Sequence, residues 1–306
     1  MNFRNVLHSL LNEISLQRWN IGIFEFETNS NIIFKFSNCK VKYLAHNFKD
    51  KWFADPFILD VTDKEIIILA EEFDRRIGRG RIAKLTIDRE KVKLNSLKII
   101  LDIKSHLSFP AIYKENNNIY IYPENSQTGK LLRYKYDCKL DALVDPELVI
   151  NEPLTDAIKE EFNGKSYIFS TKQPNPNSNR INVYCDTNNN KKYQLIQEID
   201  LADNSARGAG YFIRDRDRFY RPAQDCNTTY GKGLVFQEVI NENGVFRINE
   251  LKRVYNRHFK YGLGIHTFNT LDNVGVVDVL GYKYLFLGRL HNRINYFWKH
   301  IAKRFL

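Results

Sequence analysis

The chain has 306 residues, 43% of them hydrophobic, which is enough to bury one large core without a second domain. Its formal charge of +10 suits an anionic partner such as a phosphorylated sugar, an acidic polysaccharide or a lipid surface. Nucleic acid is not an expected partner, because the body of the chain has no zinc-finger or RNP-like pattern and no basic run interleaved with aromatic residues.

Residues 1–20 carry apolar side chains at helical spacing, from Phe3 to Ile14, among charges of both signs. We expect a short amphipathic helix here that packs on the main domain. The segment lacks the basic start, continuous apolar core and small-residue cleavage site of a signal peptide. No apolar run in the chain is long enough to cross a bilayer. A cytoplasmic protein is therefore expected.

Four cysteines are scattered along the chain without a CxxC pair or a metal-ligand spacing. They are Cys39, Cys138, Cys185 and Cys226. We expect them to be buried thiols in a reducing compartment.

Residues 21–288 repeat one pattern five times: a short strand that opens on a small or polar residue, a polar turn, and a strongly apolar strand. The paired strands are expected at 53–60 with 66–72, 108–113 with 119–124, 155–159 with 166–171, 209–213 with 218–222, and 266–269 with 275–278. Equivalent residues are Asp55, Pro110, Asp156, Gly210 and His266, at intervals of 46 to 56 residues. Sheets this small bury both faces when they stack radially. The pattern predicts an all-β fold, a five-bladed β-propeller, with a β-sandwich of coincidental spacing as the alternative.

The first strand of a propeller blade lines the central axis, so Asp55 and Asp156 are expected to converge although they are far apart in sequence. Glu71 and Glu124 close the second strand of the first two repeats and can reach the same opening. Cleavage or transfer of a glycosidic bond needs one ionised and one protonated carboxyl, and a third acid nearby keeps one of them protonated. The predicted catalytic residues are Asp55, Glu124 and Asp156, with Glu71 in reserve. For each aspartate, the alternative is a turn cap at the start of a strand.

A cluster of polar residues is expected at the mouth of the cavity, formed by Arg207, Arg221, Gln224 and Asp225. Guanidinium groups suit the phosphate or carboxylate of a substrate, or they pair with the cavity carboxyls. Isolated histidines in strands are more often hydrogen-bonded than metal-bound, so no metal or other cofactor is expected. The full set of expected substrate-binding residues is Glu71, His106, Arg207, Arg221, Gln224, Asp225, Tyr230 and His266.

Residues 289–306 return to helical spacing, with an apolar face from Leu290 to Phe305 and an opposite face that carries five arginines and lysines and no acid. This pattern predicts a basic amphipathic helix on an anionic membrane surface, which would place the protein on the inner face of the cytoplasmic membrane. The alternative is a helix packed on the side of the propeller with a solvated basic face.

An ordered series of motifs spans residues 50–270. It consists of Phe53-Ala-Asp-Pro-Phe57, Leu69-Ala-Glu71 with Gly80-Arg-Ile82, His106-Leu-Ser-Phe-Pro110, Tyr122-Pro-Glu-Asn-Ser126, Thr155-Asp156 with Tyr167-Ile-Phe169, Ala206-Arg-Gly-Ala-Gly210, and Phe219-Tyr-Arg-Pro-Ala-Gln-Asp-Cys226 with Tyr230-Gly231. The series resembles the N-terminal domain family of glucosamine inositolphosphorylceramide transferase and its bacterial relatives in surface-polysaccharide loci. That family is similar to the five-bladed propellers of glycoside hydrolase family 43. The resemblance implies that Asp55 is the base or nucleophile and that Asp156 modulates the pKa of the acid.

The expected function is a glycosyltransferase in surface polysaccharide or glycolipid biosynthesis, with a nucleotide or phosphorylated sugar as donor and a glycan or glycolipid as acceptor. The absence of an export signal argues against a scavenging hydrolase. Two alternatives remain open at this stage: a family 43-like hydrolase that trims a glycan, and a non-catalytic carbohydrate-binding propeller.

Overall fold

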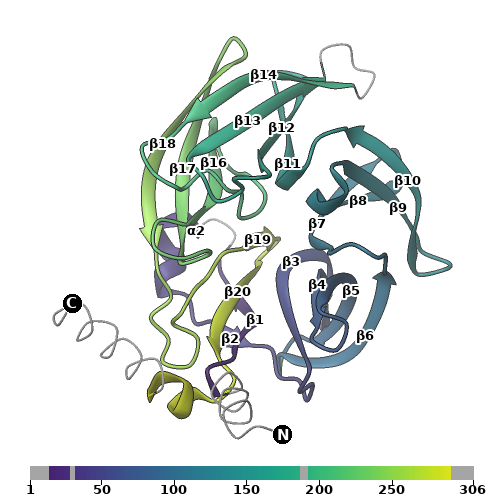
Figure 1. Cartoon of the computed structure of the whole chain (residues 1–306), viewed down its shortest axis with the longest axis vertical. Helices are drawn as coiled ribbons and strands as arrows, with labels where there is room; N and C mark the ends of the chain where they lie inside the picture. The colour runs from purple at the N-terminus through teal and green to yellow at the C-terminus, as the bar shows by residue number, and fades with distance from the viewer. Residues whose placement is uncertain (1–13, 28–31, 187–191, 291–306) are drawn as a thin grey trace, which may run out of the picture.

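The computed structural model describes residues 14–27, 32–186 and 192–290. Within these residues, four-stranded antiparallel sheets form the five blades of a β-propeller around a central axis (Figure 1). The predicted fold is confirmed. No helix in the described part of the chain combines the length and the apolar character needed to cross a lipid bilayer.

Four blades are built from consecutive strands, and in each the first strand lies nearest the axis (Figure 1). Blade one contains β3 (Lys51–Val61), β4 (Glu65–Asp74), β5 (Arg79–Asp88) and β6 (Lys93–Leu101). Blade two contains β7 (Ser108–Glu115), β8 (Asn118–Glu124), β9 (Leu131–Asp137) and β10 (Ala142–Ile150). Blade three contains β11 (Leu154–Phe162), β12 (Lys165–Lys172), β13 (Arg180–Asp186) and β14 (Tyr193–Asp200). Blade four contains β15 (Ile213–Asp215), β16 (Arg218–Asp225), β17 (Gly233–Glu242) and β18 (Val245–Val254).

Blade five joins the two ends of the described chain and closes the ring. Its strands are β19 (Phe268–Leu271), β20 (Val274–Tyr282), β1 (Gln17–Glu25) and β2 (Lys42–Tyr43), in that order. β1 pairs with β20 along its whole length. β1 begins inside the 1–20 segment, which was expected to be helical. The reason is that the apolar helical stripe stops at Ile14, and the residues that follow include Trp19 and Ile21, which favour strands.

The second strands are apolar because neighbouring blades cover both of their faces. Ile66, Ile68 and Leu69 of β4 are fully buried, whereas in outer strand β6 Ile100 is buried and the other residues are exposed or partly exposed. Aromatic contacts join the blades: the rings of Phe57 on β3 and Phe109 on β7 meet edge to face, 4.8 Å apart. Short helical segments are small additions to the described part of the chain: α2 (Ile32–Lys35), η1 (Phe36–Asn38), η2 (Ser126–Thr128) and residues 285–290.

Two expected first strands begin later than predicted, and the one in blade four is also shorter. In blade four the chain forms only an isolated bridge at Gly208 before β15 begins at Ile213. Gly210 explains the irregular path, since its φ is +143° and a Cβ there would lie 2.1 Å from the carbonyl oxygen of Phe268. In blade five the strand begins at Phe268, two residues after His266.

The expectations for the cysteines and the chain ends have mixed outcomes. The four cysteines are free, but only Cys185 is buried, and Cys138 is exposed in the turn after β9, so the expectation that all are buried was wrong. Helical conformation is present at residues 285–290, and most of the expected C-terminal helix lies outside the described residues. The apolar stripe of residues 1–13 also lies outside them.

Candidate active site

Three blades place a glutamate or a glutamine at the same register of their second strand, where blade three has Thr171. Glu71 on β4 lies opposite Ala54, and Glu124 on β8 lies opposite Ser108. Gln224 on β16 lies in the corresponding place, because its backbone N–H donates to the carbonyl oxygen of Arg207 at 2.9 Å. The propeller repeat therefore brings three residues from distant sequence positions to one cluster.

A β-bulge in the first strand adds two aspartates to this cluster. Bulges at the same register interrupt the pairing of β3, β7 and β11. The bulged residues have positive φ angles, +50° at Asp55, +45° at Phe109 and +47° at Asp156. Residues other than glycine seldom adopt this conformation, and such outliers concentrate at functional sites.

Asp55 lies between blades one, two and five, where a hydroxyl, a backbone N–H and a histidine contact its carboxyl. Its Oδ1 accepts a hydrogen bond from the Thr267 hydroxyl at 2.7 Å and lies 3.5 Å from Nε2 of His266. Its Oδ2 accepts a bond from the backbone N–H of Phe109 at 3.3 Å. The side chain is 4% exposed, so Asp55 is nearly excluded from water.

Asp278 on β20 anchors the segment that supplies His266. One carboxylate oxygen lies 2.6 Å from Nδ1 of His266 and accepts the backbone N–H groups of His266 and Thr267. The other oxygen accepts the backbone N–H of Asp55 at 2.9 Å. Asp278 and Thr267 were missed by sequence reasoning, although a buried aspartate inside the apolar run 275–278 was an available signal.

An aromatic wall from the closing strand β1 lies beside this group. The Trp19 ring stacks on His266 with centroids 4.0 Å apart, and Tyr230 meets both rings edge to face. The guanidinium group of Arg207 lies over the Tyr230 ring, 4.8 Å from the ring centroid. Sequence reasoning missed Trp19, because nothing in the sequence indicated that β1 completes blade five.

Asp156 is held by a cation. Arg207 Nε donates to its Oδ2 at 2.6 Å, and Gln224 Nε2 donates to the same oxygen at 2.7 Å. Arg207 also donates to Glu124 at 3.3 Å and to Asn177 at 2.9 Å. Pairing of Arg207 with cavity carboxyls was the open alternative to substrate binding, and it is the arrangement present here.

The two aspartates have pKa values that move in opposite directions. Burial raises the pKa of Asp55 to about 6, against the opposing effect of His266. Burial also acts to raise the pKa of Asp156, but the Arg207 charge outweighs it and the pKa falls below its ordinary value. Asp156 is therefore the more firmly ionised of the two.

The two glutamates favour their protonated forms. Burial raises the pKa of Glu71 well above its usual range, and the carboxylates of Asp55 and Glu124 raise it further. Burial and neighbouring Asp156 likewise raise the pKa of Glu124, although Arg207 opposes them. The cluster thus contains carboxylates and carboxylic acids side by side, which is the combination that acid–base chemistry on a glycosidic bond requires.

Two expected site residues lie in a separate network within blade four. Arg221 is 2% exposed, donates to Gln237 at 2.7 Å and bonds the carbonyl oxygen of Ala206, and burial lowers its pKa to about 10. Asp225 accepts bonds from Tyr255 at 2.7 Å and from Arg253 at 3.1 Å. These contacts stabilise the loop and strand behind Arg207, and among the described residues neither side chain is hydrogen-bonded to Asp55, Glu71, Glu124 or Asp156.

Asp55, His266 and Asp278 offer ligand atoms that lie within 4.8 Å of one another, a spacing that could hold a small cation. Their oxygen atoms, however, already accept hydrogen bonds from backbone N–H groups and from Thr267. The contacts are those of a hydrogen-bonded support for Asp55.

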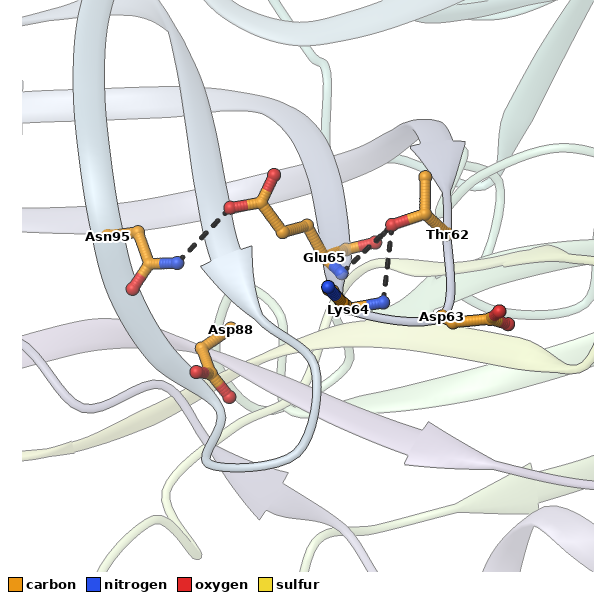
Figure 2. A pocket seen from close by; sticks show the side chains of 6 residues that line it. All are labelled: Thr62, Asp63, Lys64, Glu65, Asp88 and Asn95. Atoms are coloured by element: carbon orange, nitrogen blue, oxygen red, sulfur yellow. Dashed lines mark hydrogen bonds between the residues drawn. The ribbon is translucent and has the colours of Figure 1, made fainter.

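Hollows on the outside of the ring contain none of the carboxyl cluster. One of 560 Å³ lies over turns of blade one (Figure 2), where Thr62 caps its own turn and Asn95 donates to Glu65 at 3.3 Å. Another of 620 Å³ lies beside β18 and β2.

Solved structures with the same architecture include glycoside hydrolase family 43 enzymes. An enzyme of that family from Xanthomonas citri, complexed with xylotriose, aligns with a TM-score of 0.55 at 10% identity, over 77% of this chain and 88% of that one. A family 43 β-1,3-galactosidase with galactodeoxynojirimycin aligns with a TM-score of 0.54 at 8% identity, over 70% and 82%. At these identities the likeness establishes the fold: this is a five-bladed propeller of the family 43 type.

The sequence match identifies the family within that class. The family described as "Glucosamine inositolphosphorylceramide transferase 1, N-terminal" matches residues 31–260, and the chain belongs to it. Glucosamine inositolphosphorylceramide transferase 1 of Oryza sativa subsp. japonica is 26% identical over 200 residues, which are 63% of this chain and 27% of that protein. The chain thus spans about a quarter of the length of the curated relatives it matches. The resemblance read from the motifs is confirmed.

Proposed function

We propose that the protein transfers a glycosyl unit to a glycan or glycolipid acceptor during the assembly of a surface polysaccharide or glycolipid, with the sugar bound at the axial carboxyl cluster. The observation that carries this proposal is the convergence of Asp55, Glu71, Glu124 and Asp156 in mixed protonation states. Asp55 is assigned as the base that takes the proton of the acceptor hydroxyl. A protonated glutamate is assigned to the leaving oxygen.

Arg207 and Asp156 are assigned to positioning and charge balance. Arg207 joins Asp156 to Glu124, so the two residues share one cation. The Tyr230 ring under Arg207 and the nearby Trp19 offer the aromatic surfaces that proteins use against sugar rings. The donors to be considered are nucleotide sugars, lipid-phosphate sugars and glycosides.

The test is a product assay with a panel of these donors and with glycan and glycolipid acceptors. Mass spectrometry separates the outcomes, because transfer adds a sugar to the acceptor whereas hydrolysis releases free sugar. The variant Asp55→Asn should form no transfer product with any donor that the wild type uses. Equal product from both proteins would refute the assignment of Asp55, and free sugar alone would favour a trimming hydrolase.

A second candidate function is a non-catalytic carbohydrate-binding propeller. The observation that favours it is the pairing of Arg207 with two of the four carboxyls, together with the match to about a quarter of the curated transferases. In that case Asp55→Asn would retain binding to an immobilised glycan array, and the wild type would turn over no donor.

The proposal also places the protein at the inner face of the cytoplasmic membrane, where a lipid-linked acceptor would be present. The basic segment 289–306 supports this through its charge, although only its first two residues are described. Co-sedimentation with anionic vesicles, lost in a chain that ends at residue 288, is the expected result.

A further inference from the structure

Glu71 and Glu124 hold equivalent positions on the second strands of blades one and two, but their surroundings differ. Glu124 accepts a hydrogen bond from the Ser126 hydroxyl at 2.9 Å and one from Arg207 at 3.3 Å. Burial and the nearby carboxylate of Asp156 raise the pKa of Glu124, and the Arg207 charge opposes that rise. The Glu124 carboxyl is therefore already held by a hydroxyl and by a cation that it shares with Asp156.

Glu71 has a simpler environment. Among the described residues, the Glu71 carboxyl contacts His106, whose Nε2 lies 3.4 Å from Oε1 of Glu71. The other ring nitrogen, Nδ1, accepts the backbone N–H of Gly80 at 2.9 Å, so the proton of the neutral imidazole must be on Nε2 and face Glu71. Burial and nearby arginines lower the pKa of His106, which favours this neutral form.

The chain keeps the space around Glu71 open by using glycine at position 80. A Cβ on Gly80 would lie 2.5 Å from Oε1 of Glu71 and 2.5 Å from the carbonyl oxygen of Leu107. The His106 side chain is 32% exposed, whereas that of Glu71 is 11% exposed. His106 therefore links a buried carboxyl to solvent.

From this geometry we propose that Glu71, rather than Glu124, is the proton donor to the leaving oxygen, and that His106 is its positioning residue. The assignment rests on the proposed function. As the glycosidic C–O bond breaks, its electron pair stays on the oxygen, which takes the Glu71 proton. The new carboxylate is stabilised by the His106 N–H, while the acceptor oxygen forms the new bond to the anomeric carbon and its hydroxyl proton passes to Asp55. The substrate class is a glycoside whose leaving group is a sugar or lipid hydroxyl, because a phosphate leaves without a proton donor.

The test compares Glu71→Gln with Glu124→Gln on phenyl and dinitrophenyl glycosides of galactose, glucose, xylose, arabinose and glucosamine. Without its proton donor an enzyme loses about 100-fold or more on the poor phenyl leaving group but less than about 10-fold on dinitrophenyl. We expect this split for Glu71→Gln and equal losses on both substrates for Glu124→Gln. The ratio of the two rates within one variant does not depend on how much of that variant is folded.

A measurement on the free protein separates the two proposals. Infrared absorbance of protonated carboxyls at neutral pH should lose a component in Glu71→Gln, and that component should shift in His106→Phe. If Glu71→Gln leaves the absorbance unchanged, Glu71 is ionised and its assignment fails whatever the activity. If the glycosides are cleaved but Glu124→Gln is the variant that loses more rate on phenyl than on dinitrophenyl glycosides, only the assignment of Glu71 fails. In a third outcome, the infrared component is present but the wild type neither cleaves any glycoside nor transfers a sugar from one. The proposed function then fails, and the role of Glu71 as proton donor fails with it.

Discussion

Asp55 and Asp156 occupy the same bulge on the first strands of blades one and three, with φ angles of +50° and +47°. Each is almost fully buried, and each belongs to the same carboxyl cluster. Their electrostatic states nevertheless differ, since the pKa of Asp55 is raised to about 6 and that of Asp156 is lowered. Identical backbone geometry thus gives two carboxyls with different chemistry.

The difference lies in what the neighbouring blades contribute. Blade four supplies Arg207 and Gln224 to Asp156. Blade five supplies His266 and the Thr267 hydroxyl to Asp55. A permanent cation holds its partner ionised, whereas a hydroxyl and a histidine that can lose its charge offset the burial of Asp55 only in part, so the pKa of Asp55 stays raised. The comparison teaches that the bulge positions the acid and the adjacent blade sets its protonation.

The largest expected effect comes from Asp55→Asn. Removing the base should lower glycosyl transfer by about 1,000-fold, within the range that general base catalysis contributes, with product formation as the measurement. Asp60→Asn is the matched control, because Asp60 lies on the same strand and is exposed. Comparable losses in the two variants would show that Asp55 has no chemical role.

Arg207→Met should remove the cause of the lowered pKa of Asp156, and with it the difference in pKa between Asp156 and Asp55. Asp156 and Glu124 would lose their shared cation, and removing one partner of a buried ion pair costs about 3–5 kcal/mol. Urea unfolding measures the loss. Arg180→Met is the control, because Arg180 pairs with Asp200 on the surface and should cost less than about 1 kcal/mol. A loss no larger than the control's would mean that Arg207 does not determine the state of Asp156.

Gly208→Ala should shift the backbone at Asp156 while leaving the surroundings of Asp55 unchanged. A Cβ there would lie 2.7 Å from the carbonyl oxygen of Asp156, so the backbone must shift, at a cost of about 1–3 kcal/mol in unfolding free energy. Gly164→Ala serves as the control, because no heavy atom would contact its Cβ within 4 Å and only its φ of +73° opposes the change, at about 1 kcal/mol. Selective disturbance would appear as a larger change in a resolved Asp156 carboxyl NMR signal than in that of Asp55.

The smallest expected effect is a pH dependence of opposite sign for the two aspartates. The folded protein binds the Asp55 proton more tightly than the unfolded chain, so this residue's contribution to stability declines as pH rises from about 3.8 to about 6. Asp156 has a lowered pKa and stabilises the folded state above the unfolded pKa, an effect lost as pH falls through its folded pKa. Measured against wild type, the unfolding free energy of Asp55→Asn should change between about pH 3.8 and 6 and that of Asp156→Asn below about pH 3.8, with slopes of opposite sign. Activity that depends on Asp55 as a base should fall below about pH 6. Parallel slopes would contradict the comparison.

The amino-acid sequence by itself determined the five repeats and the positions of Asp55, Glu71, Glu124 and Asp156 on their strands. These features are local, because hydrophobic patterning and turn residues act over a few residues. The ring then follows, since each small sheet must be covered on both faces.

Tertiary structure decided which groups face each acid. Closure by β1 brought Trp19 against His266, and the packing of adjacent blades brought Arg207 to Asp156 and Asp278 to Asp55. A carboxyl's pKa depends on burial and on charges a few ångströms away, and those neighbours are more than 50 residues distant in the chain. No local pattern could report them, so the sequence indicated where the acids are and the fold decided what each one does.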